Sequence, residues 1–84
     1  MTDEKEWHVY ILRCSDGTLY TGISNDLDRR IGEHNKGTGA KYTKGRGPVR
    51  LVYQESADNR SEASKRELEI KSLTRSEKLM LIEK

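Results

Sequence analysis

A guanidinium and an imidazole share one face of a predicted helix. Leu27 and Ile31 are four residues apart, so at 100° per residue they lie on one side of the helix, which should meet a sheet. Arg30 and His34 fall on that same side. An arginine there could bind an anion, and a histidine could exchange a proton near neutral pH. The plainer alternative is an arginine reaching water along the core edge and a satisfied interfacial histidine. Three other charged residues of this helix point elsewhere: Arg29, Glu33 and Lys36.

A carboxylate stands in a comparable position on a later helix. Ala63 and Ile70 are seven residues apart on one face, and Glu67 lies between them. A carboxylate at the edge of a core needs a cation, a metal ion or hydrogen-bond donors. The structural alternative to a metal site is an ion pair of Glu67, for which Arg30 is a candidate partner.

Two tyrosines flank a turn whose length decides whether they meet. A two-residue turn at Asp16-Gly17 would place Tyr10 and Tyr20 on opposite faces of the hairpin. A three-residue Ser-Asp-Gly loop with Gly17 in the left-handed region would instead pair Tyr10 with Gly22, and both tyrosines would share a face. We predict the second register. Gly22 would then leave space beside Tyr10 for something to approach. The alternative is that both tyrosines simply fill the core.

The composition fits one small folded domain. The chain has 84 residues, of which 36% are charged and 32% hydrophobic, and its net charge is +2. We predict a single domain over residues 1–84, with a core from about 7 to 82. No stretch approaches the roughly 20 apolar residues of a membrane span, and residues 2–6 are too polar for a secretory signal. The lone Cys14 cannot form an internal disulfide, so we expect a cytoplasmic protein.

The pattern of residues predicts three strands and three helices in the order ββαβαα. The strands are expected over residues 7–14, 18–23 and 49–55, because these stretches are rich in β-branched and aromatic residues. The helices are expected from a cap at Asp26 to about 36, from Asn59 or Ser61 to about 72, and over 75–82 behind a Thr74–Glu77 capping box. An antiparallel three-stranded sheet covered by helices is an α+β fold. Leu79 and Ile82 should pack the last helix onto the core.

Basic residues concentrate in one glycine-rich segment. The window from Lys36 to Arg50 contains no acid, and its basic residues are Lys36, Lys41, Lys44, Arg46 and Arg50. Its glycines and Pro48 indicate a loop, and Tyr42 lies inside it. Such a loop suits a phosphate backbone, although a merely solvated loop would have the same composition. The P-loop pattern GxxxxGK[ST] is not matched, which argues against a nucleotide cradle of that kind.

These residues together resemble the GIY-YIG nuclease family, in its small stand-alone bacterial form. The first motif corresponds to Tyr10 within VYIL, and the second to Tyr20 within LYTGIS. The family's helix with the pattern L-x-x-R-x-x-x-H corresponds to Arg30 and His34, and its glutamate corresponds to Glu67 in KRELEIK. The resemblance runs from about Trp7 to Leu81. The departures are His8 and Thr21 within the two motifs, and Ile23 where some relatives carry a lysine.

The resemblance implies a metal-dependent endonuclease that hydrolyses phosphodiester bonds of DNA, in repair or recombination. It implies that Glu67 holds a divalent metal ion, Mg²⁺ or alternatively Mn²⁺, that Arg30 pairs with the scissile phosphate, and that Tyr10 or Tyr20 activates the water. We favour Tyr10 as the base. His34 would assist the base or orient water. Five residues would contact the nucleic acid: Lys36, Lys41, Tyr42, Lys44 and Arg46.

Two other classes of function share the same fold. One is a non-catalytic module that binds nucleic acid, and the other is a module that docks a protein partner through the apolar C-terminal helix. The combination of Tyr10, Tyr20, Arg30, His34 and Glu67 argues against both, because binding alone requires no carboxylate at the site. RNA stays open as a substrate, as do the preferred DNA structure and the oligomeric state.

Overall fold

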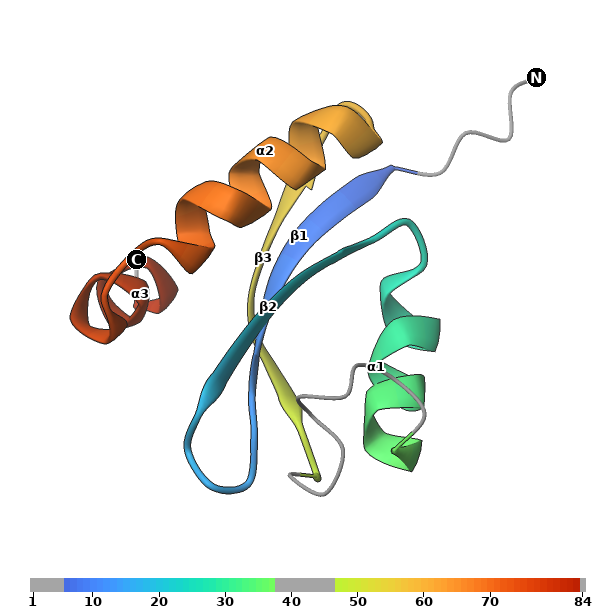
Figure 1. Cartoon of the computed structure of the whole chain (residues 1–84). Coiled ribbons are helices and arrows are strands. Elements are labelled where there is room, and N and C mark those ends of the chain that lie inside the picture. The colour runs from blue at the N-terminus through green and yellow to red at the C-terminus, as the bar shows by residue number, and fades with distance from the viewer. Residues whose placement is uncertain (1–5, 38–46, 84) are drawn as a thin grey trace.

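The protein is an α+β fold with the predicted order of elements (Figure 1). We describe it from a computed structural model, which covers residues 6–37 and 47–83. The elements are β1 (Trp7–Arg13), β2 (Leu19–Ser24), α1 (Leu27–Lys36), β3 (Arg50–Ala57), α2 (Arg60–Lys71) and α3 (Arg75–Ile82). The three strands form one antiparallel sheet in the order β2-β1-β3. None of the described helices is long and apolar enough to cross a membrane.

The β1–β2 hairpin has the register predicted from its loop. Tyr10 lies opposite Gly22 and Leu12 lies opposite Tyr20. The Cys14 amide donates to the Thr18 carbonyl at 2.9 Å, and Gly17 has a φ of 86°, the left-handed conformation that glycine adopts without strain. A register shifted by one residue would turn every side chain of β2 to the other face of the sheet. The loop therefore determines that both tyrosines lie on the same side.

Alternation along β1 builds a core on each face of the sheet. Val9 and Ile11 are fully buried with Ala63 and Ile70 of α2. The intervening residues of β1 point to the opposite face, where α1 covers them, and this second core comprises Tyr10, Leu12, Cys14 and Val49. Figure 1 shows the sheet between α1 on one side and α2 and α3 on the other. The central strand therefore belongs to both cores.

Side-chain caps begin all three helices. The Asp26 carboxylate accepts from the Arg29 amide at the start of α1, and the Asn59 side chain accepts from the Glu62 amide at the start of α2. Thr74 and Glu77 form the predicted capping box of α3. Each cap satisfies an amide that the helix itself leaves unbonded. The predicted helix starts are confirmed, with Asn59 rather than Ser61 as the cap of α2.

Two details differ from the prediction. Strand β3 begins and ends later than expected, and it contains a bulge, since Ile11 lies opposite Tyr53 whereas Leu12 lies opposite Leu51. In α3, Leu81 and Ile82 pack against the α2-side core, where we expected Leu79 and Ile82. The apolar run that ends this helix does not fix its rotation, because nearly every side of the helix is apolar there.

Candidate active site

Three aromatic rings from separate elements meet on the α1 side of the sheet. The Tyr10 hydroxyl lies 3.1 Å from Nε2 of His34, and both residues are only 1% exposed. The Tyr20 ring centroid lies 5.2 Å from that of His34 and 6.4 Å from that of Tyr10. The hairpin register supplies the two tyrosines, and α1 supplies the histidine. His34 is therefore buried and lies within hydrogen-bond distance of Tyr10, another candidate residue.

Gly22 makes this cluster sterically feasible. A Cβ at Gly22 would lie 2.7 Å from the Tyr10 hydroxyl oxygen and 3.1 Å from Cε2 of Tyr20. Both distances are shorter than ordinary carbon contacts. The space beside Gly22, which we expected to admit an approaching group, is thus occupied by the tyrosines themselves.

Burial opposes charge on both partners of the Tyr10–His34 hydrogen bond. It raises the pKa of Tyr10 to about 12, and the nearby Arg30 guanidinium offsets part of this rise. Burial also lowers the pKa of His34 below its usual value, and the positive charge of Arg30 adds to that effect. At neutral pH the pair therefore consists of a phenol and a neutral imidazole. With its proton on Nδ1, the imidazole accepts a hydrogen bond from the phenol at Nε2.

Arg30 lies beside this pair and is held by an acid of its own helix. Its Nη1 donates to Oε1 of Glu33 at 2.9 Å, while Glu33 also contacts Nε of Arg29 at 3.3 Å. The expectation that Glu33 points away from Arg30 is wrong, because residues three apart on a helix are neighbours and long side chains can bridge the angle between them. The hydrogen bond to Glu33 raises the pKa of Arg30, so the guanidinium is permanently charged.

Glu67 reaches the same region from α2. Its side chain is 20% exposed, and its charge contributes to the raised pKa of Tyr10. Its Oε2 lies 3.2 Å from Nζ of Lys71, one turn further along the helix. The ion pair that we considered for Glu67 is thus formed with Lys71, whereas Arg30 pairs with Glu33. Sequence reasoning missed Lys71, although a spacing of four residues between opposite charges is the ordinary signal for such a pair.

A single carboxylate suits a metal ion that keeps most of its own water. The described residues contain no cluster of three or more His, Cys, Asp or Glu side chains that could enclose a metal. Mg²⁺ commonly takes one or two protein carboxylates and fills its remaining positions with water and substrate phosphate oxygens. The Glu67 carboxylate, partly exposed beside the tyrosines, fits that mode of binding.

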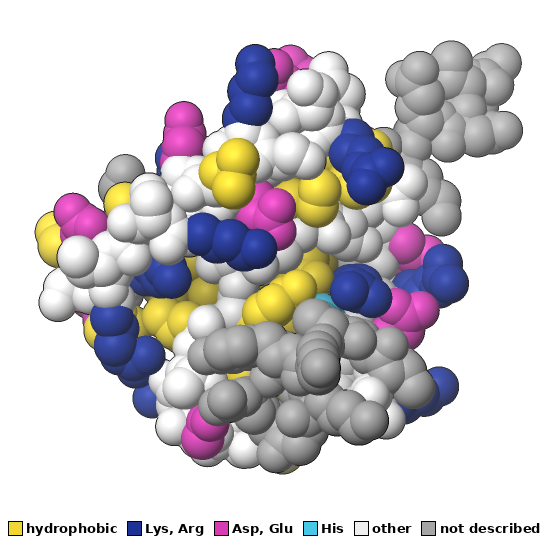
Figure 2. All heavy atoms as spheres, viewed as in Figure 1, with side chains coloured by type: hydrophobic (Ala, Val, Ile, Leu, Met, Phe, Trp, Pro, Cys, Tyr) yellow, Lys and Arg dark blue, Asp and Glu magenta, His cyan; other side chains and the backbone are white. Residues whose placement is uncertain are grey.

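The predicted basic loop lies only partly within the described residues. Lys36 is exposed at the end of α1, whereas Lys41, Tyr42, Lys44 and Arg46 lie outside the described residues. Figure 2 shows that hydrophobic side chains are visible between α2 and α1, bordered by charged side chains of both signs. The surface between these two helices is therefore one of mixed charge.

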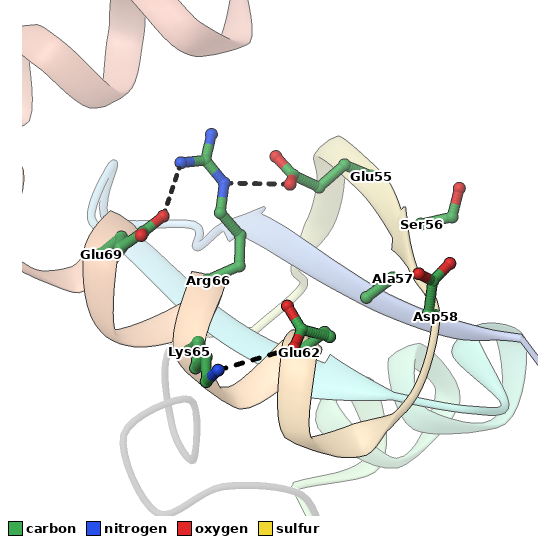
Figure 3. Close-up of a pocket in the computed structure, with 8 residues that line it drawn as sticks. All are labelled: Glu55, Ser56, Ala57, Asp58, Glu62, Lys65, Arg66 and Glu69. Carbon is green, nitrogen blue, oxygen red and sulfur yellow. Dashed lines mark hydrogen bonds and ion pairs between the residues drawn. The ribbon is translucent and has the colours of Figure 1, made fainter.

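A separate polar network attaches α2 to β3 (Figure 3). Nε of Arg66 donates to Glu55 at 2.9 Å, and its Nη1 donates to Glu69 at 3.0 Å. Tyr53 also donates to Glu55. Arg66 immediately precedes Glu67, so this network limits rotation of the helix that carries the candidate metal ligand. The three-residue spacing of Arg66 and Glu69 on one helix indicates their contact, whereas nothing in the sequence joins Arg66 to Glu55.

Comparisons with known proteins indicate the family of the chain. The family model described as the GIY-YIG catalytic domain matches residues 6–80. A UPF0213 protein of Clostridium perfringens is 60% identical over 75 residues, which cover 89% of this chain and 81% of that protein. A UPF0213 protein of Staphylococcus aureus is 61% identical over 74 residues, covering 88% and 90%.

Two solved structures have a similar fold. The solution NMR structure of a UPF0213 protein from Bacillus halodurans has a TM-score of 0.60 and 49% identity, and covers 93% of this chain and 83% of its own. The solution NMR structure of a protein from E. faecalis has a TM-score of 0.62 and 40% identity, with coverage of 96% and 88%. The likeness extends over most of each chain.

Proposed function

The chain belongs to the GIY-YIG family, and on that premise we propose that it is a metal-dependent endonuclease that hydrolyses phosphodiester bonds of DNA. Nuclease-type activity follows from the family. The metal requirement, the DNA substrate and a role in repair or recombination are our proposals. The observation that carries them is the buried Tyr10–His34 hydrogen bond, with Arg30 and Glu67 both close enough to affect the pKa of Tyr10.

We assign the scissile phosphate to Arg30. A guanidinium presents five N–H donors in a planar fork and keeps its charge at any physiological pH. One nitrogen donates to Glu33 in the free protein, and Arg30 lines a cleft between α1 and the end of β2 that includes Ser24 and Asn25. A bound phosphate would therefore share Arg30 with Glu33 or replace that carboxylate.

We assign activation of the water to Tyr10 together with His34. A phenol with a pKa of about 12 supplies almost no phenolate at neutral pH, so Tyr10 cannot act as a pre-ionised base. The hydrogen bond offers another route, in which Tyr10 passes its proton to Nε2 of His34 as it accepts one from the attacking water. Neutral His34 is ready for that role because its pKa is lowered. Tyr20, which packs against His34, would support the pair.

We assign the divalent metal ion, Mg²⁺ or Mn²⁺, to Glu67. When bound, such an ion supplies charge neutralisation at the phosphate and stabilises the leaving 3′ oxygen. The carboxylate now contacts Lys71, which has to yield at least part of that contact when Glu67 binds a cation. Lys36, Lys41, Tyr42, Lys44 and Arg46 are proposed to hold the nucleic-acid backbone. We expect the protein in the cytoplasm, because a bacterial cell holds its DNA there.

Replacing one glutamate tests the proposal. Glu67→Gln removes the charge with little change of shape, and we expect it to abolish Mg²⁺-dependent nicking of supercoiled plasmid while DNA binding persists. The matched control is Glu62→Gln, which changes an acid on the same helix whose partner Lys65 is largely exposed. EDTA should abolish cleavage by the wild type and by the control.

The outcomes separate the three classes of function. Undiminished nicking by Glu67→Gln would contradict the assigned role of this residue. Salt-sensitive binding of DNA by the wild type without any cleavage would support a binding module instead. Neither binding nor cleavage would favour a module that docks a protein partner through α3. A panel of single strands, duplexes, flaps, junctions and RNA, cut by the wild type, would then define the substrate.

A further inference from the structure

Two arginines lie opposite each other on the neighbouring strands β1 and β3, at the end of the sheet next to the β1–β2 loop. Arg13, the last residue of β1, lies directly opposite Arg50, the first residue of β3. Residues opposite each other in an antiparallel pair share a face, with Cβ atoms about 4.5–5.5 Å apart. Two guanidiniums in that position repel each other, which makes the pairing unfavourable for folding.

The bulge in β3 creates this pairing. Tyr53 lies opposite Ile11, and in a regular ladder Val52 would lie opposite Leu12 and Leu51 opposite Arg13. The bulge shifts the ladder by one residue, so that Arg50 takes the place opposite Arg13. Bulges commonly re-aim a side chain near functional sites. Here the change puts like charges together.

No acid of the described residues neutralises the pair. Both guanidiniums are exposed, and neither has an ion pair or hydrogen bond with any residue in the described ranges. Asp16, in the adjoining hairpin loop, accepts hydrogen bonds from Thr18. Four other arginines of the described residues are engaged: Arg29, Arg30 and Arg66 contact carboxylates, and Arg60 lies over the Trp7 ring.

From these observations we infer that Arg13 and Arg50 together bind one phosphate of the substrate backbone, away from the bond that is cut. The two residues line a shallow hollow with Cys14, Ser15 and Pro48. An anion held between two guanidiniums would relieve their repulsion and receive charge-assisted hydrogen bonds from both. This inference rests on the proposed function only in taking nucleic acid as the substrate.

The pair lies apart from the candidate active site. Arg13 lies three residues beyond Tyr10 on β1, about 10 Å along the strand, and its ladder partner Leu19 packs on the α2 side of the sheet, whereas Tyr10 packs on the α1 side. The proposed contact is therefore with a phosphate other than the scissile one, at the hairpin end of the sheet. A phosphate contact there would add affinity and set the register of the substrate, without reading its sequence.

Charge-removing variants test the inference by equilibrium binding. DNA binding is measured in the Glu67→Gln background, so that cleavage does not interfere. Arg13→Gln and Arg50→Gln should each weaken binding about tenfold, and each should lower the slope of log affinity against log salt by about 0.9. The double variant should be little weaker than either single variant, because both arginines serve one phosphate. The matched control is Arg75→Gln, an exposed arginine on α3 that should change affinity much less.

Thermal unfolding provides a second, independent measurement. Removing either guanidinium relieves the repulsion, so Arg13→Gln and Arg50→Gln should raise Tm slightly while they weaken DNA binding. In cleavage assays, KM should rise with kcat unchanged. Affinity or a salt slope equal to that of the Arg75→Gln control would overturn the inference, as would a wild type that does not bind DNA. Stabilisation by inorganic phosphate without any effect of the variants on DNA binding would indicate a small-anion site and would also overturn it. Failure of the Glu67 assignment alone would leave the inference intact.

Discussion

At the scale of single residues, the candidate site depends on groups that burial keeps neutral. Tyr10 and His34 are both almost completely inaccessible, and each would lose solvation by becoming charged. The opposite shifts of their pKa values keep the proton on the phenol in the free protein. Proton transfer then needs a change in the surroundings, and a bound phosphate near Arg30 would be such a change, because it would offset the positive charge that disfavours protonated His34.

This burial predicts how stability depends on pH. The pKa of His34 is lower in the folded chain than in the unfolded chain, where it is near 6.5. As the pH falls, His34 therefore takes up its proton at a higher pH in the unfolded chain than in the folded chain. The contribution of neutral His34 to the free energy of unfolding is fully present above about pH 6.5. It is lost as the pH falls from there through the lowered pKa. Wild-type Tm should consequently drop as the pH is lowered from about 6.5 to about 5.5.

His34→Gln is the control for this effect, since it keeps a polar side chain and leaves all carboxylates in place. The variant will be less stable at neutral pH, because it loses the geometry of the Tyr10 hydrogen bond. Its Tm should nevertheless fall less than that of the wild type over the same pH range. Equal declines in the two proteins would show that His34 does not titrate differently on folding.

At the scale of elements, the β1–β2 hairpin positions the site more directly than any helix does. Its loop sets the register, the register puts Tyr10 opposite Gly22, and the missing side chain at Gly22 admits both tyrosine rings. A side chain added at Gly22, in the edge strand β2, would therefore crowd both Tyr10 and Tyr20.

Gly22→Ala should disable the site while most of the fold persists. The added methyl group would lie 2.9 Å from Cζ of Tyr10, so the tyrosine rings or the strand must move. We expect a destabilisation of about 1–3 kcal/mol, typical of overpacking, and a loss of nuclease activity greater than unfolding accounts for. The measurements are denaturant unfolding and plasmid nicking at a temperature where the variant is folded.

The matched control is Gly32→Ala in the middle of α1, where an added Cβ meets no atom within 4 Å. This change should stabilise the protein by about 0.5–1 kcal/mol, because alanine favours the helix, and it should leave activity unchanged. Full activity of Gly22→Ala would mean that the packing of Tyr10 against Gly22 has no part in the chemistry.

Local signals in the sequence determined more of this structure than contacts between distant elements did. The Ser-Asp-Gly loop predicted the hairpin register, and the caps at Asp26 and Thr74 predicted where helices begin, because each signal acts within a few residues. The bulge in β3 could not be predicted, since either register keeps apolar residues facing a core. The same holds for the Glu55–Arg66 pair, which joins two elements that tertiary packing alone brings together.

For the candidate site, the sequence suggested a set of residues but not all of their partners. Helical spacing placed Arg30 with His34 and Glu67 with the core, and in the structure the charges of Arg30 and Glu67 both affect the pKa of Tyr10. The partners Glu33 and Lys71 were overlooked, although they lie at the three- and four-residue spacings at which opposite charges of one helix pair. The catalytic and metal-binding roles stay predictions that the variants above test.

At the scale of the whole molecule, the central strand joins two cores into one structure. Val9 and Ile11 pack on the α2 side and Tyr10 and Leu12 on the α1 side, so neither core can be lost without exposing the other face of the same strand. A chain this small also buries only a modest share of its surface, which leaves little stability for either half alone. We therefore expect the predicted single domain to unfold as one unit.

Leu12→Ala tests this expectation, because the change and the probe lie on opposite faces of the sheet. Leu12 is fully buried in the α1-side core, whereas Trp7, the only tryptophan, packs on the α2 side. Removing the side chain should cost about 2–5 kcal/mol. If folding is cooperative, Trp7 fluorescence should report the full loss, with a midpoint equal to that from far-UV circular dichroism. A Trp7 transition that stays at the wild-type midpoint, while circular dichroism shows an earlier one, would divide the chain into two units and contradict the single domain.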